Sequence, residues 1–314
     1  MYVIHKCVVG SRLHGTATES SDWDFRGIHM SPLIDHINPF KKVKNTSWIE
    51  GDVDNTSYEL ASFCKLATKG NATIWEVFKS DQVVTTSFRA QYMQQNWLKF
   101  MDTEAFINAS LGYARNQQNK FSLYDDLGEN QQLRTAKFVI SFLRVLWQCE
   151  QFLLTGEFMC SLHNCDMYDF IKSLKGKARD ELDIPLCYEY MERMYYRITL
   201  ARKQCPPERL DLKPDKAWIE NFLLYAYLPN TSGIYQIKNE VTGQCYVGQS
   251  INIDKRRREH FSSLRRRAHP NNLLQDAFDK YGESAFSWDI VAIHVDTSLL
   301  NDYEEKSIAE LGGF

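Results

Sequence analysis

Apolar residues in the first two thirds of the chain change from strand-like runs to helical spacing. Short β-branched and aromatic runs at residues 2–9 and 22–28 predict strands. Apolar side chains then recur at helical spacing over residues 58–69, and most of residues 87–227 continues in this way. The clearest apolar stripe covers residues 133–154 and predicts a long amphipathic helix.

The last quarter returns to short strand-like runs. Residues 233–239 and 245–248 flank a turn-forming segment and predict a β-hairpin. Asn252 suits the N-cap of the next helix, and Asp254 falls in its first turn, where the helix dipole favours an anion. The remaining expected elements are helices at residues 272–280 and 299–311 and a strand at residues 286–295.

Length and proline-containing breaks predict how the chain divides. A chain of 314 residues favours two domains, or one domain with a large insertion. The best linker is Leu-Pro-Asn-Thr at residues 228–231. We expect an α+β protein with a mixed sheet at residues 1–85 and a helical extension at residues 86–228. Residues 231–314 then form a small α/β domain, with a three-stranded antiparallel sheet flanked by helices.

Positive charge concentrates near the end of a chain that is slightly acidic overall. The formal net charge is −3, which gives no global bias toward nucleic acid. Seven cations nevertheless stand against one acid within thirteen residues. Such a run is often only a solvated helix face. Here it lies beside two tyrosines on the expected hairpin, and we expect it to neutralise backbone phosphates. Its members are Lys255, Arg256, Arg257, Arg258, Arg265, Arg266 and Arg267.

Tyrosine, arginine and histidine form a constellation typical of phosphodiester cleavage. Tyr235 and Tyr246 fall on the two expected strands. Arg256 and His260 follow at i and i+4, on one face of the expected helix. Cleavage needs an activated water and charge neutralisation at the phosphoryl oxygens, and these side chains can supply both.

Residues 232–311 resemble the GIY-YIG endonuclease domain, close to its phage homing-endonuclease form. The resemblance rests on residues that fall in family order and spacing, with Val247 in place of the usual Ile: Gly233-Ile234-Tyr235, Tyr246-Val247-Gly248, Arg256, His260 and Glu304. The sequence ends at Phe314, before the Asn that in the family usually follows the last helix, and we expect no tail that recognises a target site.

The resemblance implies a role for each matched residue. Glu304 holds one Mg²⁺ or Mn²⁺, and Arg256 clamps the phosphate. Tyr235 accepts the proton of the attacking water, directly or through His260. A nearby metal and Lys255 or Arg256 would have to lower its pKa from the usual ~10. Tyr246 orients the phosphate. DNA contacts fall to the remaining cations and to a secondary family position: Lys255, Arg257, Arg258, Arg265, Arg266, Arg267 and His269.

A pair of carboxylates near the start of the chain is typical of divalent-cation binding. Asp22 and Asp24 point to one face if residues 22–28 form a strand, because side chains alternate. Hard oxygen ligands favour Mg²⁺. An Asp-x-Asp pair alone is a weak signal for a metal site. Gly10 and Ser11, which lie upstream at a suitable distance, strengthen the interpretation.

Residues 8–80 resemble a nucleotidyltransferase of the DNA polymerase β superfamily, in the pattern Gly-Ser, Gly, Ser-Asp-x-Asp, Arg-Gly. The resemblance implies a nucleoside triphosphate substrate held by Gly10 and Ser11, and metal held by Asp22 and Asp24. A third carboxylate comes from a neighbouring strand, as Asp54 or, less favoured, Asp52; Asp54 is otherwise a turn residue before a helix. The remaining candidates are the acid Glu76, which we expect at the surface rather than in a site, and Lys137 and Arg144, either phosphate-binding or ordinary surface cations.

The remaining features bear on location and on competing functions. Eight cysteines show no paired framework, which favours free thiols in the cytoplasm, of a bacterial host if the chain is phage-encoded. Cys160, His163 and Cys165 lack a second ligand cluster for zinc. No apolar run approaches the ~18 residues of a membrane span, so no membrane partner is expected.

Three functions are open at this point. The leading one is a metal-dependent DNA endonuclease fused to a nucleotidyltransferase-like module. In the second, the transferase is the main activity and acts on RNA, DNA or protein. In the third, the chain binds nucleic acid without catalysis.

Overall fold

The computed structural model describes residues 2–19, 21–50, 53–123, 134–228, 231–293 and 296–311. It has two compact units, Met1–Lys216 and Ala217–Phe314. The first expected piece and most of the second, up to Lys216, thus form one unit. The division falls after Lys216, the first residue of helix α12 (Lys216–Tyr227), whereas the expected linker follows this helix. Pro229 and Asn230 of that linker lie outside the described residues.

Helix α12 groups with the second unit through its own contacts. Its Tyr225 is buried, and the hydroxyl donates a hydrogen bond to Asp254, in the first turn of helix α13 (Ile253–Arg265). The break at Pro214, rather than the one at Pro229, therefore lies next to the division between the units.

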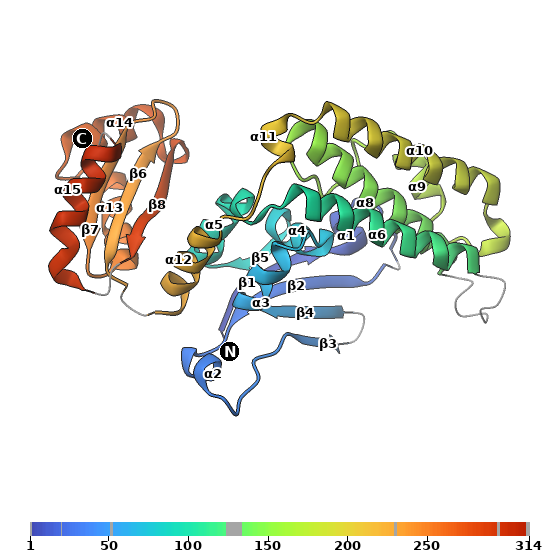
Figure 1. Cartoon of the computed structure of the whole chain (residues 1–314), viewed down its shortest axis with the longest axis horizontal. Coiled ribbons are helices and arrows are strands. Elements are labelled where there is room, and N and C mark those ends of the chain that lie inside the picture. The colour runs from blue at the N-terminus through green and yellow to red at the C-terminus, as the bar shows by residue number, and fades with distance from the viewer. Residues whose placement is uncertain are drawn as a thin grey trace. The chain divides into compact units, whose positions relative to one another are not determined.

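A five-stranded mixed sheet forms the base of the first unit (Figure 1). Its strands are β1 (Tyr2–Val9), β2 (Trp23–Met30), β3 (Thr46–Glu50), β4 (Val53–Glu59) and β5 (Val83–Thr86). The order is β3-β4-β2-β1-β5, with β2 parallel to β4 and the other neighbours antiparallel. The helix expected from residue 58 begins at Leu60, because Tyr58 and Glu59 complete β4. The Glu59 carboxylate then caps that helix by accepting from the backbone N–H of Ala61, at 2.9 Å.

Helices complete the first unit. They are α1 (Gly10–Leu13), α2 (Leu33–Ile37), α3 (Leu60–Ala67), α4 (Ala72–Lys79), α5 (Phe88–Gln95), α6 (Thr103–Ser122), α8 (Thr135–Thr155), α9 (Tyr168–Ser173), α10 (Ile184–Gln204) and α11 (Pro207–Leu210). Helices α6, α8 and α10 lie side by side (Figure 1). Aromatic rings hold α4 against them: Trp75 meets Phe106 edge-on, and Phe106 meets Phe152 in the same way.

Helix α8 is the apolar stripe expected at residues 133–154. By length and composition it could cross a membrane, contrary to the expectation that no run approaches this length. Most of its apolar window, 61%, is buried inside the protein, which is also the property of a core helix.

The second unit is built on a three-stranded antiparallel sheet in the order β7-β6-β8. The strands are β6 (Gly233–Asn239), β7 (Cys245–Ser250) and β8 (Phe286–Ile293), accompanied by α12, α13, α14 (Asn272–Tyr281) and α15 (Leu300–Leu311). Side chains that alternate along the hairpin face different helices. Ile234 and Val247 pack with Leu300 of α15, whereas Tyr235 and Tyr246 contact His260 of α13. The α+β class and the three-stranded antiparallel sheet are confirmed.

Candidate active sites

The hairpin places both candidate tyrosines on one face of the second sheet. Tyr235 is paired with Gly248, and Ile237 with Tyr246, so the two phenol rings project to the same side. Tyr235 is buried and stacks on Trp288 of β8, with ring centroids 4.3 Å apart. Gly248 leaves room for this ring, because a Cβ atom there would lie 2.5 Å from the Tyr235 hydroxyl oxygen. The glycine of the second motif therefore serves close packing.

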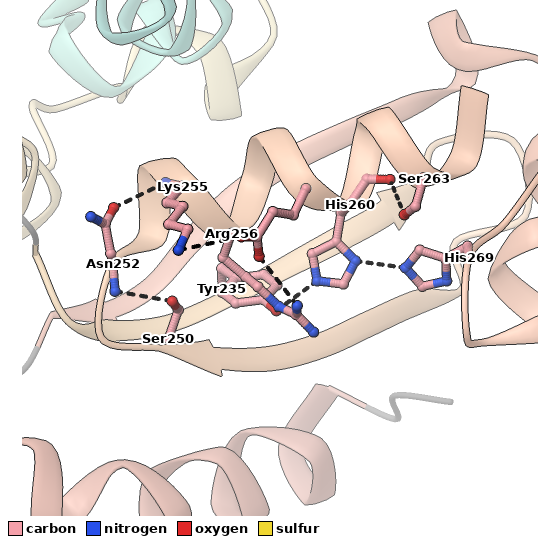
Figure 2. A network of polar contacts seen from close by, with 9 residues as sticks. Tyr235, Ser250, Asn252, Lys255, Arg256, His260, Ser263 and His269 are labelled. Carbon is pink, nitrogen blue, oxygen red and sulfur yellow. Dashed lines mark hydrogen bonds and ion pairs between the residues drawn. The ribbon is translucent and has the colours of Figure 1, made fainter. Parts of the chain in front are cut away.

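Helix α13 supplies the cation and the imidazole. Asn252 caps it as expected, since its side-chain oxygen accepts from the Lys255 N–H at 3.0 Å. Arg256 and His260 then point from one face of the helix toward Tyr235, as Figure 2 shows. Arg256 Nε donates to the Tyr235 hydroxyl at 3.3 Å, and His260 Nε2 lies 2.8 Å from the same oxygen.

A second histidine extends this array. His269 Nε2 lies 2.7 Å from His260 Nδ1, and the two rings are stacked (Figure 2). Burial, Arg256 and His269 lower the pKa of His260 from 6.5 to about 3. The imidazole is therefore neutral near pH 7 and can carry a single ring proton. His269, expected among the DNA contacts, is nearly buried and also orients His260.

Burial decides the protonation of Tyr235. It raises the pKa of this phenol well above its usual value, although the hydrogen bond from Arg256 acts in the opposite direction. The expected lowering by Arg256 is thus outweighed. Lys255, the other cation considered for lowering the pKa of Tyr235, is instead paired with Glu259, at 3.8 Å. Tyr235 is a neutral phenol in this environment.

The basic run separates into two groups. Four of its members, together with His260 and His269, line a pocket of about 740 Å³: Lys255, Arg256, Arg258 and Arg266. The others are engaged elsewhere. The Arg257 guanidinium lies over the Phe261 ring, Arg265 forms a double hydrogen bond with Glu283, and Arg267 lies 3.5 Å from Asp279.

Glu304 comes from the other face of the sheet. It lies on α15, and its Oε2 accepts a hydrogen bond of 2.8 Å from Gln249 on β7. Its charge contributes to the raised pKa of Tyr235, so the carboxylate and the phenol are within electrostatic reach. The residues lining the 740 Å³ pocket do not include Glu304.

The first unit holds a second polar pocket, of about 530 Å³. Six sequence candidates are among its lining residues: Gly10, Ser11, Asp22, Asp24, Lys137 and Arg144. Gly10 has a φ of +69°, and a Cβ atom there would lie 2.1 Å from Asp24 Oδ2. Only glycine lets the β1–α1 turn pass this close to the carboxylate. Arg12 fixes the opposite side of the turn by donating to the carbonyl oxygen of Ser21 at 2.6 Å.

Asp54 lies beside Asp24 rather than in a turn. The two residues are register partners on the parallel strands β2 and β4. Asp54 is 3.6 Å from Arg26 and is not among the residues that line the pocket. Burial raises the pKa of Asp24, and the charges of Asp54 and Asp22 act in the same direction against Arg26. Asp52 lies outside the described residues.

Glu76 differs from expectation, and it determines how Arg144 lies at this pocket. Glu76, expected at the surface, is buried and paired with Arg144 and with His14. Burial alone would raise the pKa of Glu76, but Arg144 and His14 outweigh it and hold the value at about 2. Arg144 is thus held in an ion pair at the pocket wall.

Lys175 is a further cation that sequence reasoning missed. It lines the pocket, and burial and Lys137 lower its pKa, whereas Asp24 acts in the opposite direction. It follows helix α9, far along the chain from the glycine-serine motif, so no local pattern could have marked it.

Two family models match the chain, one in each of its two parts. The model of RlaP, the RNA repair pathway DNA polymerase beta family, matches residues 1–165, and the GIY-YIG catalytic domain matches residues 231–312. The chain belongs to the RlaP family and carries in addition a GIY-YIG catalytic domain.

Individual relatives cover only parts of the chain. The intron-associated endonuclease 1 of Enterobacteria phage T4 is 43% identical over 51 residues, which are 16% of this chain and 21% of that protein. An uncharacterized 38.9 kDa phage T4 protein is 30% identical over 135 residues, 39% of this chain and 40% of that protein. The chain thus spans less than half the length of either relative.

Two solved structures align with portions of the chain. The catalytic domain of homing endonuclease I-TevI is 35% identical and aligns over 26% of this chain and 88% of that chain, with a TM-score of 0.25. A nucleotidyltransferase-like protein from Exiguobacterium sibiricum aligns over 71% of this chain and 70% of that chain, at 13% identity and a TM-score of 0.24.

Proposed function

We propose that the second unit is a metal-dependent endonuclease that hydrolyses DNA phosphodiesters. The observation that carries the proposal is the hydrogen-bonded array of Arg256, Tyr235, His260 and His269 at a cation-lined pocket. The match to the GIY-YIG catalytic domain and to an intron-associated endonuclease supports a nucleic-acid substrate, for which we propose DNA.

Glu304 is the residue that would hold Mg²⁺ or Mn²⁺. The fit is chemical: a carboxylate lies beside the side-chain amides of Gln249 and Asn301, and hard oxygen donors suit these ions. When bound, the ion neutralises charge on the phosphoryl oxygens and stabilises the leaving oxygen.

Tyr235 and His260 manage the proton of the attacking water. Because the phenol is buried and neutral, a free phenolate is unfavourable. The neutral His260 Nε2, 2.8 Å from the hydroxyl, can accept the phenol proton while Tyr235 takes one from water, once a phosphate anion in the pocket offsets the burial and the Arg256 charge that disfavour the imidazolium. His269 keeps the imidazole in place. Tyr246, half-buried beside His260, is positioned to orient the phosphate.

Arg256 is the phosphate clamp, because its planar guanidinium reaches the pocket while Nε stays on Tyr235. Lys255, Arg258 and Arg266 extend the phosphate contacts along DNA. The other predicted contacts, from Arg257, Arg265 and Arg267, are secondary, since these side chains are engaged by ring or carboxylate partners.

Cleavage of supercoiled plasmid with Mg²⁺ tests this proposal. Wild type should nick or cut, and Arg256→Ala, Glu304→Ala and EDTA should each remove the activity. Activity that survives EDTA or Glu304→Ala would contradict the metal mechanism. A wild type that binds DNA at low salt without cutting would favour a non-catalytic nucleic-acid-binding protein.

We propose a second activity, nucleotidyl transfer from a nucleoside triphosphate, for the first unit. The pocket size suits such a ligand. Gly10, Ser11, Lys137, Arg144 and Lys175 would surround the phosphates. Asp22 and Asp24 would hold Mg²⁺, with Asp54 joining from the next strand on release from Arg26.

The donor set for that metal is only partly assembled. Among the residues that the structure describes, no group of three or more His, Cys, Asp or Glu side chains has metal-binding geometry. Two hard carboxylates at one pocket still fit Mg²⁺, with nucleotide phosphates completing the ligands. The ion when bound activates the acceptor hydroxyl and the leaving pyrophosphate.

Incorporation of labelled nucleotide tests the transferase, with RNA, DNA and protein offered as acceptors. The family description favours RNA. Asp22→Ala/Asp24→Ala should abolish incorporation and leave plasmid cleavage unchanged. Failure with all four triphosphates would count against this activity. We place the protein in the cytoplasm of a bacterial host, because its relatives are phage proteins and its eight cysteines are free thiols.

A further inference from the structure

Gln249 connects the strand of the second tyrosine motif to the helix that carries Glu304. It directly follows Gly248 on β7, and its side chain faces α15. A side-chain amide has two N–H hydrogens. In Gln249 both are directed to α15: Nε2 lies 2.5 Å from Asn301 Oδ1 and 2.8 Å from Glu304 Oε2.

The sheet makes this link important. Glu304 and the Tyr235 array belong to opposite faces, and both contact residues of β7. The Tyr235 hydroxyl packs over Gly248, and the next residue holds the carboxylate. Asn301 lies one turn before Glu304 on α15, so its oxygen fixes the second hydrogen of the same amide.

We infer that Gln249, itself oriented by Asn301, is a positioning residue that holds the Glu304 carboxylate in the orientation that binds the divalent cation. The inference rests on the proposed endonuclease function. A glutamate on the outer helix has several rotamers, and an ion binds well only when its ligand is held in one of them. The amide supplies that restraint without adding charge beside the carboxylate.

Mn²⁺ binding, followed by electron paramagnetic resonance, tests the inference without relying on turnover. The full chain is used in an Asp22→Asn/Asp24→Asn background, which removes the carboxylates of the other candidate metal site. Gln249→Met keeps the length of the side chain and removes the amide. Gln236→Met is the matched control: Gln236 shares the sheet face but contacts Asp289, at 3.4 Å.

We expect Gln249→Met to weaken Mn²⁺ binding by about tenfold to a hundredfold. Asn301→Ala should weaken it by about fivefold, the value of one hydrogen bond. Gln236→Met should match the background protein. Cleavage by Gln249→Met at saturating Mn²⁺ should recover most of the rate, because the defect lies in metal affinity.

Two results would overturn the inference, and they differ in scope. In the first, Gln249→Met binds Mn²⁺ within twofold of the background protein, while Glu304→Ala still abolishes binding. This result would remove only the positioning role of Gln249. Absence of saturable Mn²⁺ binding in the background protein, together with cleavage that ignores EDTA, would remove the metal mechanism as well. Equal thermal melting of all variants shows that neither result comes from misfolding.

Discussion

The two candidate sites differ in how far their polar groups are satisfied within the protein. In the second unit, Arg256, Tyr235, His260 and His269 bond to one another in sequence. In the first unit, Lys137 and Lys175 both line the pocket, and no ion pair with an acid is found for either among the described residues. The nuclease array is therefore pre-organised before substrate arrives. The transferase pocket holds cations that repel one another until a polyphosphate neutralises them.

The largest expected effect tests the pre-organisation of the nuclease site. Gly248→Ala places a Cβ atom 2.5 Å from the Tyr235 hydroxyl oxygen and must displace the ring. A displacement on the order of 1 Å costs about a hundredfold in rate. Single-turnover cleavage should fall by that factor, with DNA affinity unchanged. Gly112→Ala, in open space on α6, is the control, and equal rates for both variants would contradict the tight packing.

The next effect tests the unneutralised pocket of the first unit. Lys175→Ala should weaken nucleoside triphosphate binding by about tenfold or more, because a charge-assisted hydrogen bond is lost. Calorimetric titration with a non-hydrolysable analogue measures it. Lys172→Ala is a close control on α9, since Lys172 lies over the Tyr168 ring instead of lining the pocket. Equal losses in both variants would assign the effect to net charge alone.

A smaller effect distinguishes the two groups of cations in the basic run. Arg266 lines the nuclease pocket, whereas Arg265 is paired with Glu283. Arg266→Ala should reduce the slope of log affinity for DNA against log salt by about one. Arg265→Ala should leave the slope nearly unchanged. Fluorescence anisotropy at several salt concentrations measures both, and equal slopes would mean that the whole run contacts phosphates.

The last prediction concerns stability rather than activity or binding, so it stands outside this ranking. Folding lowers the pKa of His260 from 6.5 to about 3, so below pH 6.5 the unfolded chain binds a proton that the folded protein does not. The contribution of His260 to the free energy of unfolding is therefore complete above pH 6.5. It decreases as the pH falls toward 3, by at most about 1.4 kcal/mol per pH unit. His260→Gln should flatten the dependence of the unfolding free energy on pH, measured with urea. An unchanged slope would mean that this imidazole is not protected from protonation.

Local motifs made the nuclease site readable from the sequence. The hairpin tyrosines, the Asn252 cap and the i, i+4 pair of Arg256 and His260 depend on spacings of two and of 3.6 residues, which the sequence displays directly. The Asp22–Asp24 motif and its glycine-serine turn are local in the same sense. These patterns led to both families, and the families are confirmed.

Tertiary structure alone decided the partners of the charged groups. Glu76 meets Arg144 across 68 residues, and Gln249 meets Glu304 across 55. Lys175 reaches a pocket defined by Asp22, and the basic run divides because Glu283 and Asp279 take up two of its arginines. The local sequence determines which face of an element is polar. Which charge it meets depends on how distant elements pack, and that pairing sets burial, pKa and the residues that remain available to a ligand.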